Sequence, residues 1–501
     1  MASTSIIGRK KEIDRLQRIF NSDKSEFVAI YGRRRVGKSY LIDEAFKGKF
    51  AFNAVGIYMD ENVRGAKTYY KEQLSHFYDS LLDYGLALDT PQPNNWQEAF
   101  RLLKLLLSKK KKKRKVIFLD ELPWMAGSQS SEFVSELGYF WNYWACKQRN
   151  IVLIVCGSAT SWMLDNVIHD YGGLHGRLTE KMQLLPFTLN ECEQYFLAHH
   201  FRMSRYEIAL CHMILGGIPY YMDLFRNDKT LSENIDDMFF ANESAKQEFR
   251  DVYVGLFKSS EKYIDIVKAL GRKFYGMTRQ EISETIGVKT GGTLSKMIDN
   301  LKYSGIIREY PRVGKQRKET IYQLVDFFSL FYLRFIEGNT MARRGNWRSL
   351  QRTSSFFAWA GNTFELLCIN HQRQLCNKLH IVNPTNCYCW SGKNPDGKGA
   401  QIDLLLEWNG ERTDYLCEMK FSETKYTITK EVEENIQNKI EAFLNSKQHK
   451  PSHSLQVILV TSFGLKDRRE ASCVNEEVTL DDLFAVNQIQ CDITADKLFN
   501  A

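Results

Sequence analysis

The amino-acid sequence predicts a multidomain α/β protein, and three local patterns carry this prediction. A glycine-rich loop follows the apolar run at 27–31 and precedes a segment with helical spacing. Residues 260–324 have the pattern of three helices followed by a hairpin. Residues 401–421 contain two strand-like runs around an Asn-Gly pair. Because 501 residues exceed what one ordinary hydrophobic core holds, we expect about three domains.

The composition is that of an ordinary globular protein. Hydrophobic residues make up 44% of the chain and charged residues 26%. The net charge of +8 permits a nucleic-acid partner without arguing for one. The N-terminal stretch MASTSIIGRKKEIDR lacks the apolar core of a signal peptide, and no apolar run approaches the roughly 18 residues that span a membrane. We therefore expect a soluble, cytoplasmic protein with no membrane partner.

The 11 cysteines are scattered from Cys146 to Cys491 without a C-x-x-C pair. The odd number and the spacing indicate reduced thiols of an intracellular protein rather than a disulfide framework. Cys387 and Cys389 are close enough in sequence to bind one metal ion, but no histidine or cysteine lies at zinc-finger spacing from them. We therefore disfavour a metal site at these two cysteines.

The first predicted element is a strand, a glycine loop and a helix. Phe27 to Tyr31 is a short apolar run typical of a buried parallel strand. GRRRVGKS, residues 32–39, matches G-x-x-x-x-G-K-S in full, and YLIDEAF follows with helical spacing. Backbone N–H groups of such a loop bind phosphates, its lysine reaches the β- and γ-phosphates, and its serine hydroxyl binds Mg²⁺. The loop residues expected to bind ATP and Mg²⁺ are Gly32, Val36, Gly37, Lys38, Ser39 and Tyr40.

Two further apolar strands end in polar residues. KVIFLDE, residues 115–121, ends in Asp120 and Glu121, and IVLIVCGS, residues 151–158, ends in Ser158. Ligand sites in open α/β sheets lie at the carboxyl ends of the strands, so these side chains are expected beside the phosphates. We predict that Asp120 holds Mg²⁺ and that Glu121 orients or deprotonates the attacking water.

Several motifs of this part resemble those of one family, the archaeal-type ATPases, which are P-loop proteins of the AAA+ superfamily close to its signalling (STAND) branch. The resemblance covers about residues 5–340 and rests on IIGRKKEIDRL, GRRRVGKS, FLDE, CGSATS and GGIPYYM. It implies that Gly8 and Arg9 lie near the adenine and that Ser158 is the sensor-1 residue. It also implies that GGIP lies in a helical lid over the nucleotide.

Arg177 falls where this family has an arginine after the sensor strand. The resemblance implies an arginine finger, acting within the chain or on a neighbouring subunit of a homo-oligomer, that stabilises charge on the transferring phosphoryl group. A surface or ion-paired arginine is the competing interpretation.

Two basic segments lie outside these motifs. The arginines at 33–35 are expected to face solvent or a partner, because the phosphate cradle uses the backbone. The run KKKKKRK at 109–115 has the composition of a nucleic-acid patch, but it directly precedes a predicted buried strand. We favour a solvated, self-repelling loop that leads into that strand.

Residues 251–325 are predicted to form a winged helix. SEKYIDIVKALGRK is an amphipathic helix, a capping box of Thr278 and Glu281 begins a second helix, and TGGTLSKMIDNLKYSG forms the third. IIREY and ETIYQLV then form the hairpin, or wing, around a turn at Gly314.

DNA is a candidate partner of this winged helix. DNA-binding versions place the third helix in the major groove and contact the backbone with the wing. The third helix offers only Lys296 and Lys302 as outward cations, so a purely structural role stays an equal alternative. The wing suits phosphate contact better, because against the single acid Glu309 it carries Arg308, Arg312, Lys315, Arg317 and Lys318.

The strand TDYLCEMKF, residues 413–421, carries two opposite charges on one face. Glu418 and Lys420 are two residues apart, so their side chains point to the same side of the strand. A charged residue is rarely buried without a partner, so an apolar strand with both charges calls for an explanation.

The preceding hairpin supplies a third charge. With the Asn-Gly pair at 409–410 as a two-residue turn, Trp408 faces Glu411. Counting outward from this turn places Asp403 diagonal to Glu418 and on the same face. Two clustered carboxylates favour a divalent cation or a shifted pKa.

An Asp followed by Glu-x-Lys on the next strand resembles the PD-(D/E)xK restriction-endonuclease-like superfamily, and many archaeal-type ATPases end in such a domain. The resemblance covers about residues 350–465 and implies a metal ion at Glu365, Asp403 and Glu418, with Glu418 and Lys420 catalytic. Gly-Ala-Gln-Ile stands where the superfamily has a proline before the aspartate. A structural Glu–Lys pair and a degenerate domain that binds without cutting are the competing interpretations.

The predicted fold is a P-loop NTPase parallel sheet with a helical lid, a winged helix and a C-terminal α/β nuclease-like domain. The predicted function is an ATP-binding, Mg²⁺-dependent ATPase that couples nucleotide state to the winged helix and to a nuclease-like domain acting on DNA. A non-nucleolytic ATP-dependent switch or scaffold that controls protein partners is the competing function. The predicted segments are an ATPase core at 1–190, a lid at 191–250, a winged helix at 251–325, a linker helix and hinge at 326–349 and the nuclease-like domain at 350–501.

Overall fold

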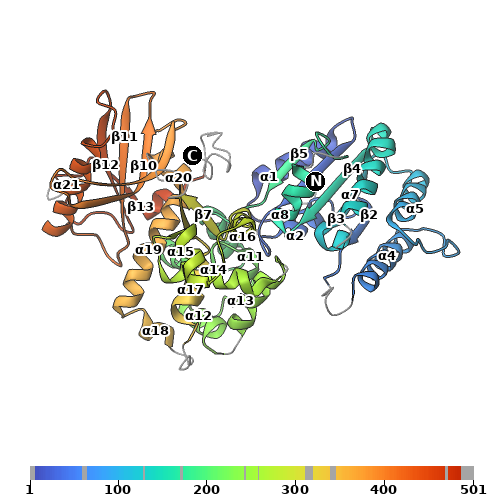
Figure 1. Cartoon of the computed structure of the whole chain (residues 1–501), viewed down its shortest axis with the longest axis horizontal. Helices are drawn as coiled ribbons and strands as arrows, with labels where there is room; N and C mark the ends of the chain where they lie inside the picture. Colours follow the sequence, from blue (N-terminus) through green and yellow to red (C-terminus); the bar gives the residue numbers. More distant parts are fainter. Residues whose placement is uncertain are drawn as a thin grey trace. The chain divides into compact units, whose positions relative to one another are not determined.

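The chain forms two compact units, which the computed structural model in Figure 1 shows with their helices and strands. The first unit comprises Met1–Pro186 with Val252–Ser260, and the second comprises Phe187–Asp251 with Glu261–Ala501. No helix among the described residues is both long and apolar enough to cross a membrane. The structure describes residues 6–58, 65–127, 130–169, 173–241, 244–257, 259–310, 320–338, 346–468 and 472–486.

The first unit is built on a five-stranded sheet in the order β2-β3-β4-β1-β5, in which all neighbouring strands run parallel. The central strands are buried along almost their whole length, which explains their continuous apolar sequences. The predicted parallel sheet is therefore confirmed. Its strands are β1 (Glu26–Tyr31), β2 (Phe50–Val55), β3 (Lys115–Asp120), β4 (Ile151–Gly157) and β5 (Glu180–Gln183).

Helices surround this sheet, and those after β2 and β3 supply most of its apolar core. Phe77, Trp96, Phe100 and Phe133 pack their rings together there. The helical segments of the unit are α1 (Lys10–Asn21), α2 (Lys38–Ala45), α4 (Ala66–Asp83), α5 (Trp96–Lys109), α6 (Leu122–Ala126), α7 (Ser130–Tyr139), η2 (Phe140–Trp144), η3 (Ala145–Gln148), α8 (Thr160–Met163) and η4 (Leu164–Ile168).

The basic run at 109–115 does not behave as a fully solvated loop. Lys115 begins β3 with a buried side chain, and its ammonium donates to the carbonyl of Leu107 at 2.8 Å. Arg114 donates to the carbonyl of Ile19 at 2.8 Å. Both acceptors lie in the last turn of a helix, where carbonyls lack intrahelical partners and attract cations. The predicted solvated loop is wrong for these two residues.

The second unit begins with a group of helices. The pair Gly216 and Gly217, with φ of 70° and 65°, turns the chain between two of them. A side chain at Gly217 would lie 2.3 Å from the carbonyl oxygen of Phe187, so this turn needs glycine. These helices are α9 (Leu189–Ala198), α10 (Arg205–Leu215), α11 (Pro219–Met222), α12 (Leu231–Phe239) and α13 (Ser244–Val254), and α13 ends in the segment that belongs to the first unit.

Three helices and a small antiparallel sheet follow, as the sequence predicted for this stretch. Thr278 and Glu281 form the predicted capping box, and Gly287 ends that helix with φ of 67°. The sheet has the order β6-β8-β7. Its elements and the surrounding helices are α14 (Ser260–Arg272), β6 (Met277–Thr278), α15 (Arg279–Ile286), α16 (Gly292–Tyr303), β7 (Ile307–Tyr310), β8 (Ile321–Leu324) and α17 (Phe327–Phe335).

The cations predicted for the wing and for the third helix have different outcomes. Arg308 is buried, and its Nε donates to Gln323 Oε1 at 2.8 Å, so the prediction of an exposed phosphate contact is wrong for this residue. Lys302 forms an ion pair with Glu309 at 2.9 Å instead of facing a partner. Burial and pairing, which composition cannot reveal, remove both from the predicted basic surface. The tip of the hairpin, with Arg312, Gly314, Lys315, Arg317 and Lys318, lies outside the described residues.

The C-terminal part is a five-stranded mixed sheet in the order β13-β12-β11-β10-β9. The helix α19 packs against β11, and α21 packs against β9 and β10. Strands β9, β10 and β11 are antiparallel, whereas β11, β12 and β13 are parallel. The elements are α18 (Asn346–Leu350), α19 (Ser354–Asn370), α20 (Gln372–Lys378), β9 (Asn386–Lys393), β10 (Gly399–Trp408), β11 (Thr413–Lys420), α21 (Lys430–Leu444), β12 (Ser454–Thr461), β13 (Glu476–Thr479) and α22 (Leu480–Leu483).

The hairpin between β10 and β11 differs from the prediction. Trp408 pairs with Thr413 rather than with Glu411, so residues 409–412 form the connection. Arg412 adopts a left-handed φ of 53°, which lengthens the turn beyond the Asn-Gly pair. The predicted register is therefore wrong by two residues. Side chains alternate with a period of two, so the face predicted for each strand is unchanged.

Candidate functional site

The first candidate site lies where β1 ends and α2 begins. Gly32 has a φ of 144°, and a side chain there would lie 2.3 Å from the carbonyl oxygen of Leu184. Gly37 has a φ of 89° and directly precedes the helix at Lys38. Both glycines are thus required by the backbone. The loop they shape leads into the N-terminus of α2, as a phosphate-binding loop does.

Lys38 lies inside this loop. Its side chain is buried, and Nζ donates to the carbonyl oxygens of Gly32 and Arg33, both at 2.9 Å. The lysine is thus held where a phosphate of a bound nucleotide would meet it. Of the neighbouring predicted residues, Ser39 is half-buried and Tyr40 is exposed.

The stretch that the sequence placed near the adenine contacts the same loop. Gly8 and Arg9 both have left-handed backbones, with φ of 67° and 56°. The buried guanidinium of Arg9 donates to the carbonyl of Val36 at 3.1 Å. These residues therefore lie against the loop.

Asp120, Glu121 and Ser158 come together at the neighbouring strand ends. Asp120 is buried, and its Oδ1 accepts a hydrogen bond from the Glu121 N–H at 2.8 Å. Glu121 has a left-handed φ of 47°, and its carboxylate accepts hydrogen bonds from the Ser158 hydroxyl at 2.5 Å and the Ser158 N–H at 3.1 Å. The sequence predicted these residues individually but gave no signal for this direct bond.

The arginines near this site are placed differently. Arg177 is exposed in the turn before β5. Arg33 is buried, so the expectation that it faces solvent is wrong. Arg34 lies over the ring of Trp124 at 5.7 Å, and a side chain on Gly255 would lie 2.0 Å from its Nη1. This arginine therefore packs against the returning segment of the first unit.

The second candidate site surrounds Glu418 on β11. The carboxylate is buried, and its two oxygens accept hydrogen bonds from Lys420 at 2.8 Å and from Lys439 at 2.7 Å. Burial raises the pKa of Glu418, but the two lysines outweigh it and hold that pKa below its ordinary value. Lys439, on α21, was missed by the sequence interpretation. It lies three residues after the buried Ile436, on the apolar face of that helix, and this position is the signal that could have found it.

Asp403 and Glu365 join this cluster. Burial raises the pKa of Asp403, and so does Glu418, whereas Lys439 and Lys420 act against the shift. Burial, then Asp403 and Glu418, raise the pKa of Glu365 on α19 to about 8. Three carboxylates this close repel one another and are stabilised by a proton or by a cation. The donor set therefore fits a divalent ion, which oxygen ligands of this kind bind.

The four residues predicted for this site, Glu365, Asp403, Glu418 and Lys420, line one pocket of about 470 Å³. The turn before β6 was not predicted to contribute, yet its residue Tyr275 lines the same pocket. Burial, then Glu365 and Asp403, raise the pKa of the Tyr275 hydroxyl. This residue was missed because it lies in a turn more than a hundred positions away from the charged strand.

Side chains of β7 and β8 hold the turn that carries Tyr275 in place. Gln323 donates to the carbonyl of Phe274 at 2.8 Å and accepts from the buried Arg308. Gly276 has a φ of 84°, and a side chain there would lie 2.5 Å from the carbonyl oxygen of Tyr322. Arg308 also lines a neighbouring cavity together with Asp403 and Glu365. The small sheet thus forms one wall of the second candidate site.

The fold and the first site define a class, the P-loop ATPases. Its marks here are a parallel sheet, a glycine loop after β1 that encloses a lysine, and carboxylates at the end of β3, which β4 separates from β1. Residues 6–225 match the family described as "ATPase domain predominantly from Archaea". The chain therefore carries an archaeal-type ATPase domain, and the resemblance predicted for about residues 5–340 is confirmed over residues 6–225. A domain of this family implies nucleotide binding.

Curated relatives come from Methanocaldococcus jannaschii. "Uncharacterized protein MJECL04" is 22% identical over 452 residues, which cover 86% of this chain and 91% of that protein. "Uncharacterized ATP-binding protein MJ0423" is 42% identical over 43 residues, which cover 9% of this chain and 73% of that protein.

Among solved structures, the chain is similar to the Walker-type ATPase PABY2304 of Pyrococcus abyssi. The identity is 20%, the TM-score is 0.46, and the match covers 66% of this chain and 96% of the other. The ORC2 protein of Aeropyrum pernix, in ADPNP–ADP complexes, matches with 14% identity, a TM-score of 0.38 and coverage of 66% and 95%.

Proposed function

We propose that the protein is a Mg²⁺-dependent ATPase that couples nucleotide state to a winged helix and to a nuclease-like domain acting on DNA. One observation carries the ATPase part: Lys38 is enclosed in a glycine loop at the end of β1, in the same parallel sheet whose strand β3 leads into Asp120 and Glu121. This is the set of groups that phosphoryl transfer to water needs.

Each group has a role in this proposal. Lys38 exchanges its two loop carbonyls for phosphate oxygens, and Ser39 and Asp120 hold Mg²⁺, which neutralises charge on the phosphates. Glu121 orients or deprotonates the water, and Ser158 sets the direction of its carboxylate. Arg177 is exposed, so it is free to act as an arginine finger within the chain or in a homo-oligomer. Gly8 and Arg9 contact the adenine side of the nucleotide.

The ATPase proposal is tested with Lys38→Ala. We expect loss of ATP affinity and a fall in hydrolysis of about 100-fold, because the variant removes the charge that stabilises the transferring group. Lys47→Ala is the matched control, since Lys47 is an exposed lysine that follows the same helix. ATP binding and hydrolysis that are unchanged in Lys38→Ala would refute the proposal.

For the C-terminal part, we propose a PD-(D/E)xK-like nuclease site. The clustering of three carboxylates and Lys420 around one pocket supports this function. Glu365, Asp403 and Glu418 would hold a divalent cation, which supplies an activated water and stabilises charge on the phosphate. Lys420 neutralises the charge that develops on the scissile phosphate.

The nuclease proposal is tested by incubating the protein with plasmid DNA in Mg²⁺ or Mn²⁺. We expect cleavage that Glu418→Gln abolishes and that Glu423→Gln, a change at an exposed position five residues away, leaves intact. Cleavage that survives Glu418→Gln, or no cleavage with either cation, would overturn the catalytic assignment.

We also propose that the segment at 251–325 is a winged helix that contacts DNA. Three helices and an antiparallel hairpin in this order support it. The combined variant Lys315→Glu and Arg317→Glu is expected to weaken DNA binding and to flatten its dependence on salt. DNA affinity that is unchanged across a salt series would leave this segment with a structural role. The flanking segments at 1–190, 191–250, 326–349 and 350–501 are the proposed core, lid, linker and nuclease-like domain.

A second candidate function is a non-nucleolytic switch or scaffold that controls protein partners. One observation favours it: both oxygens of Glu418 already contact lysines, which neutralise the carboxylate without a metal ion. The switch predicts ATP-dependent partner binding with no DNA cleavage, so the plasmid assay separates the two functions.

A further inference from the structure

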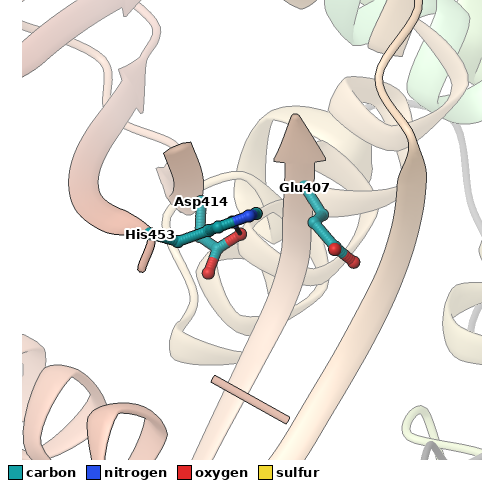
Figure 2. A group of neighbouring side chains, drawn as sticks. All are labelled: Glu407, Asp414 and His453. Atoms are coloured by element: carbon teal, nitrogen blue, oxygen red, sulfur yellow. Dashed lines mark hydrogen bonds and ion pairs between the residues drawn. The ribbon is translucent and has the colours of Figure 1, made fainter. Parts of the chain in front are cut away.

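A second cluster of titratable side chains lies at the hairpin end of β10 and β11 (Figure 2). Glu407 and Asp414 are directly opposite one another across the two strands, and His453 immediately precedes β12. One ligand atom from each of the three residues lies within 4.8 Å of the others. All three residues are buried, with 6%, 2% and 9% of their surface exposed. None of them lines the pocket around Glu418.

Two carboxylates in directly opposed, buried positions repel each other unless cations or donors compensate them. Asn386 donates to one oxygen of Glu407 at 2.8 Å, and the ammonium of Lys450 contacts the other. His453 Nδ1 lies 3.0 Å from Asp414 Oδ1. The ammonium of Lys450 also donates to Asn409 Oδ1 at 3.0 Å, and 47% of its side chain is exposed.

A second imidazole lies next to Asp414. His449 Nδ1 is buried, makes no hydrogen bond to any residue that the structure describes, and lies 3.6 Å from Asp414 Oδ2. His449 and His453 are separated by three residues, which is a spacing that zinc ligands use. The cluster thus offers two imidazoles and two carboxylates, from the hairpin and from the connection between α21 and β12.

We propose that Glu407, Asp414, His449 and His453 bind one zinc ion. Zinc prefers four nitrogen, sulfur or oxygen ligands in tetrahedral arrangement, and this set supplies four from three segments of chain. Each imidazole binds through Nδ1 and carries its proton on Nε2, while Lys450 moves from Glu407 into solvent. The ion fastens the connection after α21 to the β10–β11 hairpin, a role independent of the nuclease assignment.

The test is a metal analysis of the full-length protein, purified from zinc-supplemented cells and dialysed against excess Mg²⁺ so that sites for hard cations are filled. We expect inductively coupled plasma mass spectrometry to find one zinc ion per chain. After replacement by Co²⁺, we expect the visible absorption of a tetrahedral site. Less than a tenth of a zinc ion per chain, on the order of the background for adventitious metal, together with no cobalt spectrum, would overturn the proposal.

Variants locate the ion. Asp414→Asn keeps the shape of the side chain, and His453→Ala removes a ligand. Each is expected to weaken zinc binding by more than the roughly 10- to 100-fold that loss of a supporting hydrogen bond costs a metal site. His76→Ala, at an exposed histidine of the first unit, is the control and keeps its zinc. Zinc content that is equal in all three variants places the ion elsewhere and refutes the site.

The variant Lys450→Met distinguishes a zinc site from a metal-free network of ion pairs. If the cluster binds zinc, removing the competing ammonium leaves zinc affinity equal or higher. If the lysine is itself the structural cation, the wild-type chain holds no zinc and Lys450→Met lowers the melting temperature. A melting temperature of Asp414→Asn measured with and without zinc shows whether loss of metal, rather than failure to fold, explains its behaviour.

Discussion

Two buried histidines make a quantitative prediction about the second unit. His212 on α10 and His371 at the end of α19 lie with ring centroids 5.6 Å apart. His371 Nε2 accepts a hydrogen bond from the Leu189 N–H at 2.9 Å, and His212 Nε2 lies 3.0 Å from the carbonyl oxygen of Phe187. These bonds connect the start of α9 to α10 and to the C-terminal part, and the bond at His371 requires a neutral imidazole because Nε2 is the acceptor. The perturbation is acidification from pH 8 to pH 5.

The magnitude follows from the pKa values. Burial, then the charge of His371, lowers the pKa of His212 from 6.5 to about 3, and burial lowers the pKa of His371 to about 4. The unfolded chain therefore binds protons below pH 6.5 while the folded chain does not. The stabilisation is present above pH 6.5 and is lost as the pH falls. At pH 5 each histidine lowers the free energy of unfolding by about 2 kcal/mol, and the pair by about 4 kcal/mol, relative to pH 8.

The assay is urea denaturation at the two pH values, with His371→Gln beside the wild-type chain. The variant cannot titrate at this position, so its loss of stability between pH 8 and pH 5 is expected to be smaller by about 2 kcal/mol. Carboxylates also titrate in this range, but their contribution cancels in the comparison. His76→Gln, at an exposed histidine, is the control and is expected to match the wild type. Equal losses in wild type and His371→Gln would refute the reasoning.

Three further predictions concern the candidate sites. Ser158→Ala removes the hydroxyl that bonds Glu121, so hydrolysis is expected to fall about tenfold with ATP affinity unchanged; an equal fall in affinity would contradict this role. Lys439→Met removes one of two cations from the buried Glu418 and is expected to cost about 3 kcal/mol of stability by thermal unfolding; no loss would show that Lys420 suffices. Tyr275→Ala is expected to raise KM for DNA cleavage while leaving Mn²⁺ affinity unchanged, and an unchanged KM would make this residue only a wall of the pocket.

The elements that the sequence predicted well are those whose cause is local. Gly32 and Gly37 supply the positive φ angles of the glycine loop. The motif that predicts this loop is one contiguous stretch of sequence. The capping box of Thr278 and Glu281 is equally local, because its two partners are three residues apart. The archaeal-type ATPase domain was predictable because such short motifs follow one another at fixed spacing.

The β10–β11 hairpin shows where local signals fail. The Asn-Gly pair is the strongest short turn signal, but the chain continues to Arg412 before it pairs again. The error was two residues, and an even error leaves each side chain on its predicted face. Asp403 therefore joined Glu418 even though the predicted register was wrong. An error of one residue would have separated them.

The hydrogen-bond partners of lysine and arginine side chains were the feature that the sequence predicted least well. Arg308, Arg114 and Lys115 all belong to basic stretches that suggest solvent or nucleic acid. Arg308 and Lys115 are nevertheless buried, and the half-buried Arg114 also donates to an acceptor within the protein. Their partners are carbonyls at helix ends and a glutamine on a neighbouring strand. No local pattern marks these acceptors, because every helix end has unpaired carbonyls and only the fold decides which cation reaches them.

Strand β11 carries two buried carboxylates on one face, and both are compensated by groups from α21 or from the connection that follows it. Asp414 and Glu418 point to the same side of the strand, since they are four residues apart. The compensating groups come from α21, whose Lys439 contacts Glu418, and from the connection that follows it, whose His453 contacts Asp414. Because that connection directly continues α21, an ion that fastens it also restrains the helix that carries Lys439.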